Sequence, residues 1–383
     1  MSGLSFTLSA DQETIRDMAG AFAATHLAPH ALAWDRTKTF PVETIRQAAA
    51  LGMAGIYVSE AHGGSGLSRL DAALIIEALA TGCPTISAYI SIHNMVAGMI
   101  DIYGDAAQKT AYLPRLCGMD WLASYCLTEP GAGSDAAALT TRAIADGDDY
   151  VLTGTKQFIS GAGVSQLYLV MARTGGPGAA GVSAFLVEAG TPGLSFGPNE
   201  QKMGWNAQPT AQVIMQDCRI PAANRLGPEG TGFKIAMAGL DGGRINIGAA
   251  SLGGAQAALD KTISYLGERK AFGQTLDNFQ ALQFRIADMA TSLEAARLLL
   301  WRAATALDAQ SPDATRLCAM AKRLATDTGF EVANAALQLH GGYGYLADYG
   351  VEKIVRDLRV HQILEGTNEI MRVIISRQLL KAG

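Results

Sequence analysis

The sequence predicts an α+β multidomain protein in which two helical regions enclose a β region. Residues 9–117 are rich in alanine and have helical periodicity, the stretch from Trp121 to Gly230 contains short β-type runs, and long amphipathic patterns return after Gly232. A chain of 383 residues is also too long for one ordinary core. We therefore expect three domains, at 1–120, 121–230 and 231–383.

The composition excludes several classes of function. Hydrophobic residues make up 49% of the chain and charged residues 17%, which indicates well-packed domains. The 30 basic and 35 acidic residues give a net charge of −5 without a basic cluster, so nucleic acid is not the expected partner. The five cysteines are scattered and should be reduced thiols, and the six histidines do not form a ligand set, so no metal site is expected.

The N-terminal segment predicts a cytoplasmic protein without a membrane span. Met1–Phe6 has neither the basic nor the apolar region of a targeting segment. No apolar run in the chain approaches the length of a membrane span. Ser9 and Gln12 instead have the spacing of a capping box, which predicts a helix that begins at once.

The first two regions have different periodicities. Four to six helices are expected before residue 117, with breaks at Pro29, at Gly63-Gly64 and at Pro84. The β region then has several short runs separated by turn signals, which is typical of a barrel or a sandwich. These β-type runs are 124–127, 150–152, 167–170, 184–187 and 212–215.

The third region predicts an up-and-down helical bundle. Residues 278–308 and 312–340 each sustain an apolar stripe. Ser311-Pro312 is typical of a cap and first turn, and Gly341-Gly342 should end the second helix. One helix before Asn278 and another after Thr367 would complete the bundle.

Glu365 is the most informative residue of the chain. It follows two apolar residues and precedes Gly366 and Thr367, whose hydroxyl can cap a helix that runs on to Leu380. Apolar walls raise the pKa of a carboxylate, while the positive end of a helix lowers it. A carboxylate placed between these effects can abstract a weakly acidic proton. The alternative is a solvated residue in a loop that leads into a helix.

Four further motifs could approach a ligand, and each has a plainer explanation. Residues 125–135 and 156–161 combine glycines, hydroxyls and an aromatic ring, but they could be ordinary turns. Residues 269–273 carry two cations that suit a pyrophosphate or a helix C-terminus, and 338–342 could be a simple C-cap. None is a P-loop or a Rossmann fingerprint. Asp241–Arg244 places two glycines in a presumed helix, which indicates a close neighbour.

Taken together, these motifs resemble the acyl-CoA dehydrogenase family over essentially the whole chain. The matching stretches are YCLTEPGAGSD at 125–135, FIS at 158–160, RKAFG at 269–273, QLHGG at 338–342 and LEGTNE at 364–369. The resemblance implies an N-terminal α-helical domain, a central β-barrel and a C-terminal four-helix bundle. It also implies FAD as cofactor and a homotetramer built as a dimer of dimers.

The resemblance also implies a role for individual residues. Glu365 matches the catalytic base. FAD in the same subunit would be bound by Tyr125, Cys126, Leu127, Thr128, Gly133, Ser134, Phe158, Ile159 and Ser160, with Thr367, Asn368 and Glu369 nearby. FAD of a neighbouring subunit would be reached by Arg269, Phe272, Phe279, Gln280, Gln338, Leu339, His340, Gly341 and Gly342. Acyl-CoA would contact Ser134, Asp241, Gly242, Gly243, Arg244 and Arg377.

In the family, the base removes the α-proton of the thioester while the β-hydride passes to flavin N5, which leaves a 2-enoyl-CoA. Hydrogen bonds from the Glu365 amide and a ribityl hydroxyl of FAD would polarise the thioester carbonyl. Electron-transfer flavoprotein would then take up the electrons.

Departures from the family pattern indicate the branch. Some branches, including isovaleryl-CoA dehydrogenase, carry the base at the position of Gly243. Glycine has no side chain that could accept a proton, so Glu365 is left as the candidate base. Leu364 replaces a frequent tyrosine, Phe158 a frequent tryptophan and Glu369 a frequent glutamine. The pattern resembles enzymes for a short, branched, isobutyryl-type acyl-CoA of valine degradation. Open alternatives are a butyryl- or 2-methylbutyryl-CoA dehydrogenase, an acyl-CoA oxidase and a non-catalytic acyl-CoA-binding protein.

Overall fold

The computed structural model describes residues 7–381, so the segment Met1–Phe6 on which the localisation prediction rests lies outside the described residues. The first helix begins at the predicted capping box: the Gln12 amide donates to Ser9 Oγ over 3.2 Å, and the Ser9 amide donates to Gln12 Oε1 over 3.0 Å. Six α-helices follow one another before the first strand. They are α1 (Ala10–Phe22), α2 (Ala31–Thr37), α3 (Val42–Ala49), α4 (Arg69–Gly82), α5 (Pro84–Tyr103) and α6 (Ala106–Cys117). A π-helical turn, Ala23–Leu27, extends α1.

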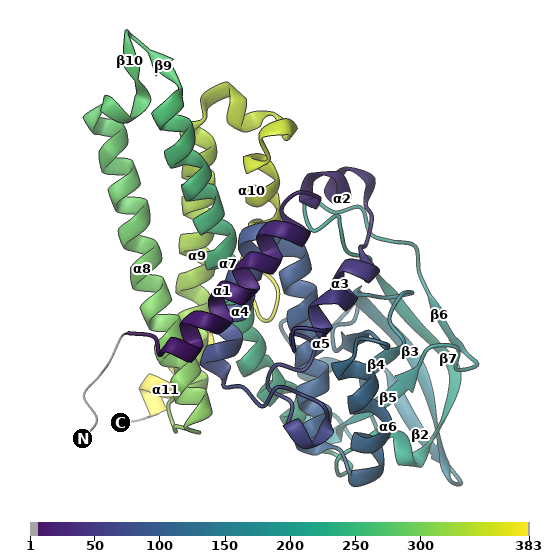
Figure 1. Ribbon diagram of the computed structural model, residues 1–383. Coiled ribbons are helices and arrows are strands. Elements are labelled where there is room, and N and C mark those ends of the chain that lie inside the picture. The colour runs from purple at the N-terminus through teal and green to yellow at the C-terminus, as the bar shows by residue number, and fades with distance from the viewer. Residues whose placement is uncertain (1–6, 382–383) are drawn as a thin grey trace.

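The β region forms one eight-stranded sheet, and all five β-type runs of the sequence overlap its strands (Figure 1). Its path is β6-β7-β3-β2-β4-β5-β8, and β1 pairs in parallel with β4. Strands β4 and β5 are buried along almost their whole length. The strands are β1 (Ala123–Cys126), β2 (Arg142–Asp146), β3 (Asp149–Ser160), β4 (Leu167–Arg173), β5 (Val182–Glu188), β6 (Leu194–Phe196), β7 (Thr210–Pro221) and β8 (Arg225–Leu226).

Long helices form the third region, at the opposite side of the molecule from the sheet (Figure 1). A small hairpin of β9 (Lys270–Ala271) and β10 (Gln274–Thr275) joins the first two of them. The bundle helices are α7 (Gly232–Glu268), α8 (Gln280–Asp308), α9 (Ala314–Leu339) and α11 (Asn368–Lys381), with α10 (Val351–Arg359) between the last two. The predicted cap at Ser311 is wrong, because α9 begins at Ala314 with Asp313 in the cap position.

Close backbone contact joins the two helical regions. A Cβ added to Gly253 of α7 would lie 2.0 Å from the Glu77 carbonyl oxygen of α4, so only glycine lets these helices approach so closely. The largest buried apolar cluster accordingly combines α1, α4, α7, α8 and α9. The order helical, β, helical is confirmed, while the domain boundaries at 120 and 230 stay a prediction. No helix within residues 7–381 is long and apolar enough to cross a membrane.

Candidate active site

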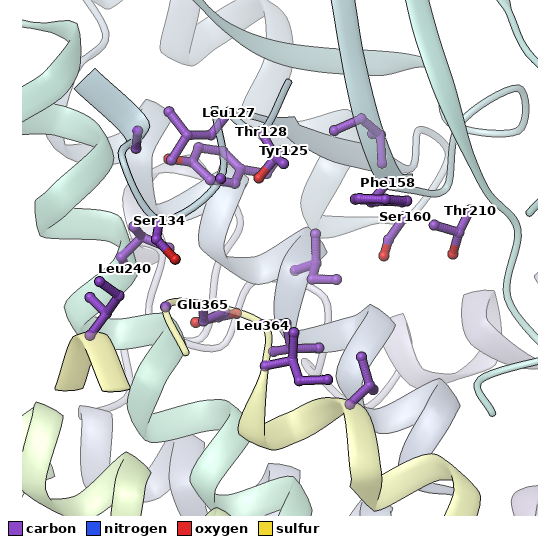
Figure 2. Close-up of a pocket in the computed structure, with 18 of the residues that line it drawn as sticks. Tyr125, Leu127, Thr128, Ser134, Phe158, Ser160, Thr210, Leu240, Leu364 and Glu365 are labelled. Atoms are coloured by element: carbon purple, nitrogen blue, oxygen red, sulfur yellow. The ribbon is translucent and has the colours of Figure 1, made fainter. Parts of the chain in front are cut away.

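A cavity of about 650 Å³ lies where the sheet meets the bundle. Figure 2 shows Glu365 facing the loop after β1, which carries Leu127 and Thr128, while Phe158, Ser160 and Thr210 occupy the other end. Of the residues predicted as catalytic base or as contacts of cofactor and substrate, ten line this cavity: Tyr125, Leu127, Thr128, Gly133, Ser134, Phe158, Ile159, Ser160, Arg244 and Glu365.

Glu365 stands on a sharp turn that leads into α11. Its backbone is left-handed with φ of 55°, and Gly366 follows with φ of 90°. The Ile370 amide donates to Thr367 Oγ1 over 3.3 Å, which confirms Thr367 as a helix cap. A non-glycine residue in this conformation carries strain and is held in place by its surroundings. The turn directs the carboxylate into the cavity instead of toward solvent.

The Glu365 carboxylate is poised to accept a proton. Its Oε2 is buried and has no hydrogen-bond partner within the described residues. Burial raises the pKa of Glu365 to about 7, although the charges of Arg244 and Lys322 pull it downward. A carboxylate of this pKa is partly ionised near neutral pH, and its ionised form is a much stronger base than an exposed carboxylate.

Gly243 of α7 makes the room for this carboxylate. A Cβ on Gly243 would lie 2.1 Å from Glu365 Oε2, which is far inside van der Waals contact. A Cβ on the preceding Gly242 would instead lie 2.6 Å from Arg69 Nη1. The two mid-helix glycines that the sequence singled out therefore both have close neighbours, and one of these is the candidate base.

Arg244 holds the turn from the side of α7. Its Nη1 forms an ion pair of 2.6 Å with Asp241 Oδ1, and its Nε donates to the Glu365 carbonyl oxygen over 3.4 Å. Thr315 Oγ1 donates to the second oxygen of Asp241 over 2.6 Å. The Glu365 N–H itself has no acceptor within residues 7–381, so it can donate to a bound ligand.

The opposite end of the cavity combines hydroxyls with an exposed ring. Phe158 has φ of 60° at a β-bulge of β3, and 62% of its surface is exposed. Ser160 Oγ accepts a hydrogen bond from Gln208 Nε2. The oxygen of the same amide, Gln208 Oε1, is buried and accepts no hydrogen bond within the described residues. The flat apolar face of Phe158 and the hydroxyls of Ser160 and Thr210 line the cavity together and match the face and edge of a flavin ring, so this lining fits FAD.

A buried ion pair fixes the loop that forms one wall. Lys156 Nζ lies 2.7 Å from Glu129 Oε1 and also donates to the Leu127 carbonyl oxygen over 3.1 Å. Glu129 accepts three further bonds from Thr140 and Thr141. Burial would raise the pKa of Glu129, but Lys156 and these donors hold it at about 2. Thr128 is thereby placed by a rigid scaffold.

The residues predicted to reach a neighbouring FAD lie elsewhere. Tyr265 and Arg269 line a second, more open pocket of about 390 Å³ at the ends of α7 and α9. Gln338, Leu339, His340, Gly341 and Gly342 also line it. Phe272 and Phe279 lie outside this pocket; the Phe272 side chain is 95% exposed, and its ring contacts Phe279 edge to face. Gln280 is exposed at the start of α8.

Several predicted residues point away from the first cavity. Cys126 is buried on the other face of β1 from Tyr125. Asn368 is buried inside the bundle, and Thr367 serves as the cap. Glu369 and Arg377 are exposed on α11. Their roles toward cofactor or substrate stay predictions.

Sequence reasoning did not single out a number of residues of the cavity wall. Trp205 belongs to the stretch 204–206, which indicates only the family branch, and it has a left-handed backbone with φ of 56°. The other residues belong to no motif that points to a ligand. They include Ile92, Met95, Lys202, Met203, Thr210, Phe233, Met237, Leu240, Arg356 and Arg359.

Comparison with known proteins covers nearly the whole chain. Residues 9–120, 124–218 and 230–380 match the N-terminal, middle and C-terminal domains of acyl-CoA dehydrogenases. The chain is 56% identical to the mitochondrial isobutyryl-CoA dehydrogenase of Bos taurus, over 98% of this chain and 91% of that protein. Butyryl-CoA dehydrogenase from Megasphaera elsdenii is 38% identical, with a TM-score of 0.96 over 98% of this chain and 100% of that one. An FAD complex of PigA is 33% identical, with a TM-score of 0.95 over 99% of this chain and 100% of that one.

Proposed function

The chain belongs to the acyl-CoA dehydrogenase family and is an FAD-dependent oxidoreductase, and we propose that it oxidises a short branched acyl-CoA, isobutyryl-CoA, to the 2-enoyl-CoA with Glu365 as base. The observation that carries this proposal is the buried, unpartnered Oε2 of Glu365 inside the main cavity.

Glu365 removes the α-proton of the thioester. Oε2 receives the proton, and the high pKa of the carboxyl lets it compete for a carbon acid. The Glu365 N–H donates to the thioester carbonyl and stabilises the negative charge that develops there. Arg244 keeps the turn in register through the Glu365 carbonyl and Asp241. The apolar walls exclude water that would solvate the carboxylate.

FAD, when bound, accepts the hydride that leaves the β-carbon. Thr128 and Ser160 would bond the polar edge of its ring, and Phe158 would cover one face. Tyr125, Ser134 and Ile159 would complete this wall. The Lys156–Glu129 ion pair keeps the wall rigid, and a rigid wall would hold the bound ring in one orientation.

Preference for a branched C4 chain rests on the resemblance to isobutyryl-CoA dehydrogenase and on the apolar end of the cavity. Leu240 and Leu364 flank Glu365 in Figure 2. One methylene in such a pocket is worth about 1–3 kcal/mol, or roughly 10- to 200-fold in kcat/KM. The preference is therefore measurable but modest.

A panel of thioesters tests the proposal. Isobutyryl-, butyryl-, 2-methylbutyryl- and isovaleryl-CoA are compared by kcat/KM with a dye as electron acceptor. Isobutyryl-CoA should give the highest value, and a higher value for butyryl- or 2-methylbutyryl-CoA would contradict the substrate assignment. Hydrogen peroxide produced in air would favour an oxidase, and the absence of flavin bleaching without air would favour a non-catalytic binding protein.

The second pocket supports a proposal about assembly. We infer a homotetramer, a dimer of dimers, in which Arg269, Phe272, Phe279, Gln280 and 338–342 contact the FAD of a neighbouring subunit. The exposed Phe272 and the open pocket at the ends of α7 and α9 fit such a contact. Light scattering should give the mass of four 40.1 kDa chains, and a monomer that retains FAD tightly would contradict it.

Two further assignments stay proposals of the family resemblance. Electron-transfer flavoprotein should replace the dye as acceptor. Arg377, Asp241 and Thr367 to Glu369 are proposed as ligand-binding residues from the resemblance alone, since none of them lines the cavity. The domain boundaries at 120 and 230 and a cytoplasmic location are proposed from the sequence alone.

A further inference from the structure

Lys322 is a buried cation beside the turn that carries the base. It lies on α9 with no exposed surface. Its Nζ donates to the Gly366 carbonyl oxygen and to Asn368 Oδ1, each over 2.9 Å. Within residues 7–381 it forms no ion pair at 4.0 Å or less, whereas buried lysines are usually paired with a carboxylate. Only neutral oxygens therefore contact this ammonium.

The two contacts bracket the strained turn. Gly366 directly follows Glu365, and Asn368 is the first residue of α11. Asn368 is itself fixed by α9, because its Nδ2 donates to Thr326 Oγ1 over 3.0 Å and to Asp327 Oδ1 over 2.7 Å. Backbone in a sparsely populated conformation persists only where its surroundings over-determine it. The ammonium supplies that constraint on the inner side of the turn.

The charge of Lys322 also acts on the carboxylate. Burial lowers the pKa of Lys322 to about 8, and Glu365 is the largest charge that opposes this fall. Glu365 is in turn favoured in its ionised form by Arg244 and Lys322. The charged and titratable groups around the two are Arg244 on α7, Asp327 on α9, Glu369 on α11, Tyr57, Tyr125 and the buried His361.

We propose that Lys322 is a positioning residue of the reaction, which fixes the Glu365–Asn368 turn and keeps Glu365 ionised until substrate arrives. This inference rests on the proposed role of Glu365 as base. Transfer of the α-proton neutralises Glu365 and ends its attraction to Lys322. Lys322 therefore stabilises the ionised carboxylate before the reaction and not the protonated carboxyl group after it.

Two substitutions separate the charge of Lys322 from its hydrogen bonds. Lys322→Met removes both, while Lys322→Gln keeps a donor for Gly366 and removes the charge. The rate of anaerobic flavin reduction is measured from about pH 5.5 to about pH 9 with whichever thioester reduces the wild-type flavin fastest. Lys261→Met, an exposed lysine on α7, is the matched control for loss of one positive charge.

The acid limb of the rate profile should move upward by about one pH unit in both Lys322 variants, because Glu365 loses a nearby cation. The limiting rate at high pH should fall at least ~10-fold in Lys322→Met, because the turn loses the hydrogen bonds that Lys322 donates. It should fall less in Lys322→Gln, because glutamine keeps a donor for Gly366. The affinity for acyl-CoA should change by less than about two-fold. Lys261→Met should have the profile of the wild type.

Acid limbs that coincide with the wild type in both variants would overturn the proposal, since a purely structural lysine does not shift this profile. If both variants fail to fold with FAD, Asn368→Ala gives the decision, because it loosens the ammonium and leaves its charge in place. A lower limiting rate in Asn368→Ala, with the FAD content and the acyl-CoA affinity of the wild type, would support the positioning role. A wild-type rate, or a lower rate that a loss of FAD or of acyl-CoA affinity accounts for, would contradict it. Failure of the wild type to be reduced by any thioester would instead contradict the proposed function.

Discussion

Gly243 and Glu365 are complementary: the glycine leaves empty the space in which a Cβ would lie 2.1 Å from Glu365 Oε2. A glycine in a helix interior costs about 1 kcal/mol relative to alanine, and α7 carries this one where its backbone comes closest to the carboxylate of the base. The carboxylate of Glu365, on the turn that leads into α11, and a side chain at position 243 therefore cannot occupy the same space. This geometry explains why the sequence has a carboxylate at only one of the two positions.

Gly243→Ala should push the carboxylate out of place. We expect FAD content to be kept and the rate of flavin reduction by acyl-CoA to fall at least ~10-fold, because about 1 Å of misplacement costs that much or more. Stopped-flow absorbance of the flavin measures the rate. Gly20→Ala on α1 is the control, because nothing lies within 4 Å of its added Cβ. An unchanged rate in Gly243→Ala would show that the base tolerates displacement.

Glu129 should contribute stability that is lost in acid. Its pKa in the fold is about 2, below the ordinary 4.5, so the contribution is fully present above pH 4.5 and disappears as the pH falls toward 2. Glu129→Gln should therefore be less stable than the wild type near neutral pH by up to about 3 kcal/mol. Urea unfolding at several pH values measures the difference, which should shrink in acid. A constant difference would mean that the ion pair with Lys156 does not set this pKa.

Glu365 should have the opposite linkage. Burial raises its folded pKa to about 7 from 4.5, so the stability linked to it is fully present below pH 4.5 and is lost as the pH rises through about 7. Glu365→Gln cannot ionise and should become more stable than the wild type by about 1–3 kcal/mol at pH 8.5 relative to pH 5. Thermal unfolding of the FAD-loaded proteins at both values measures this, and a gap independent of pH would contradict it.

Local signals in the sequence predicted most of the fold. Capping residues Ser9 and Thr367 both cap the helices that they were expected to cap. The long stripes at 278–308 and 312–340 became α8 and α9 within two residues at each end. The missed strands β6 and β8 are only three and two residues long, and β2 is mostly exposed, so none has enough alternating burial to be recognised.

The site was predictable only where its residues are clustered in sequence. The motifs gave Glu365, Thr128 and Phe158 together, and strand alternation could have shown that Cys126 faces away from Tyr125. Lys322 was not predictable, because a single lysine in an alanine-rich helix is usually solvated. Its burial arises from the docking of α11 and of the Glu365 turn against α9, which no local pattern encodes.

The central claim is that Glu365 is the base, and anaerobic flavin bleaching in Glu365→Gln tests it most directly. Glutamine keeps the shape of the side chain and cannot accept the α-proton. The account predicts that Glu365→Gln retains FAD, binds acyl-CoA with a spectral shift of the flavin, and loses nearly all reduction while the wild type bleaches. Substantial bleaching of Glu365→Gln by the same thioester would contradict the account.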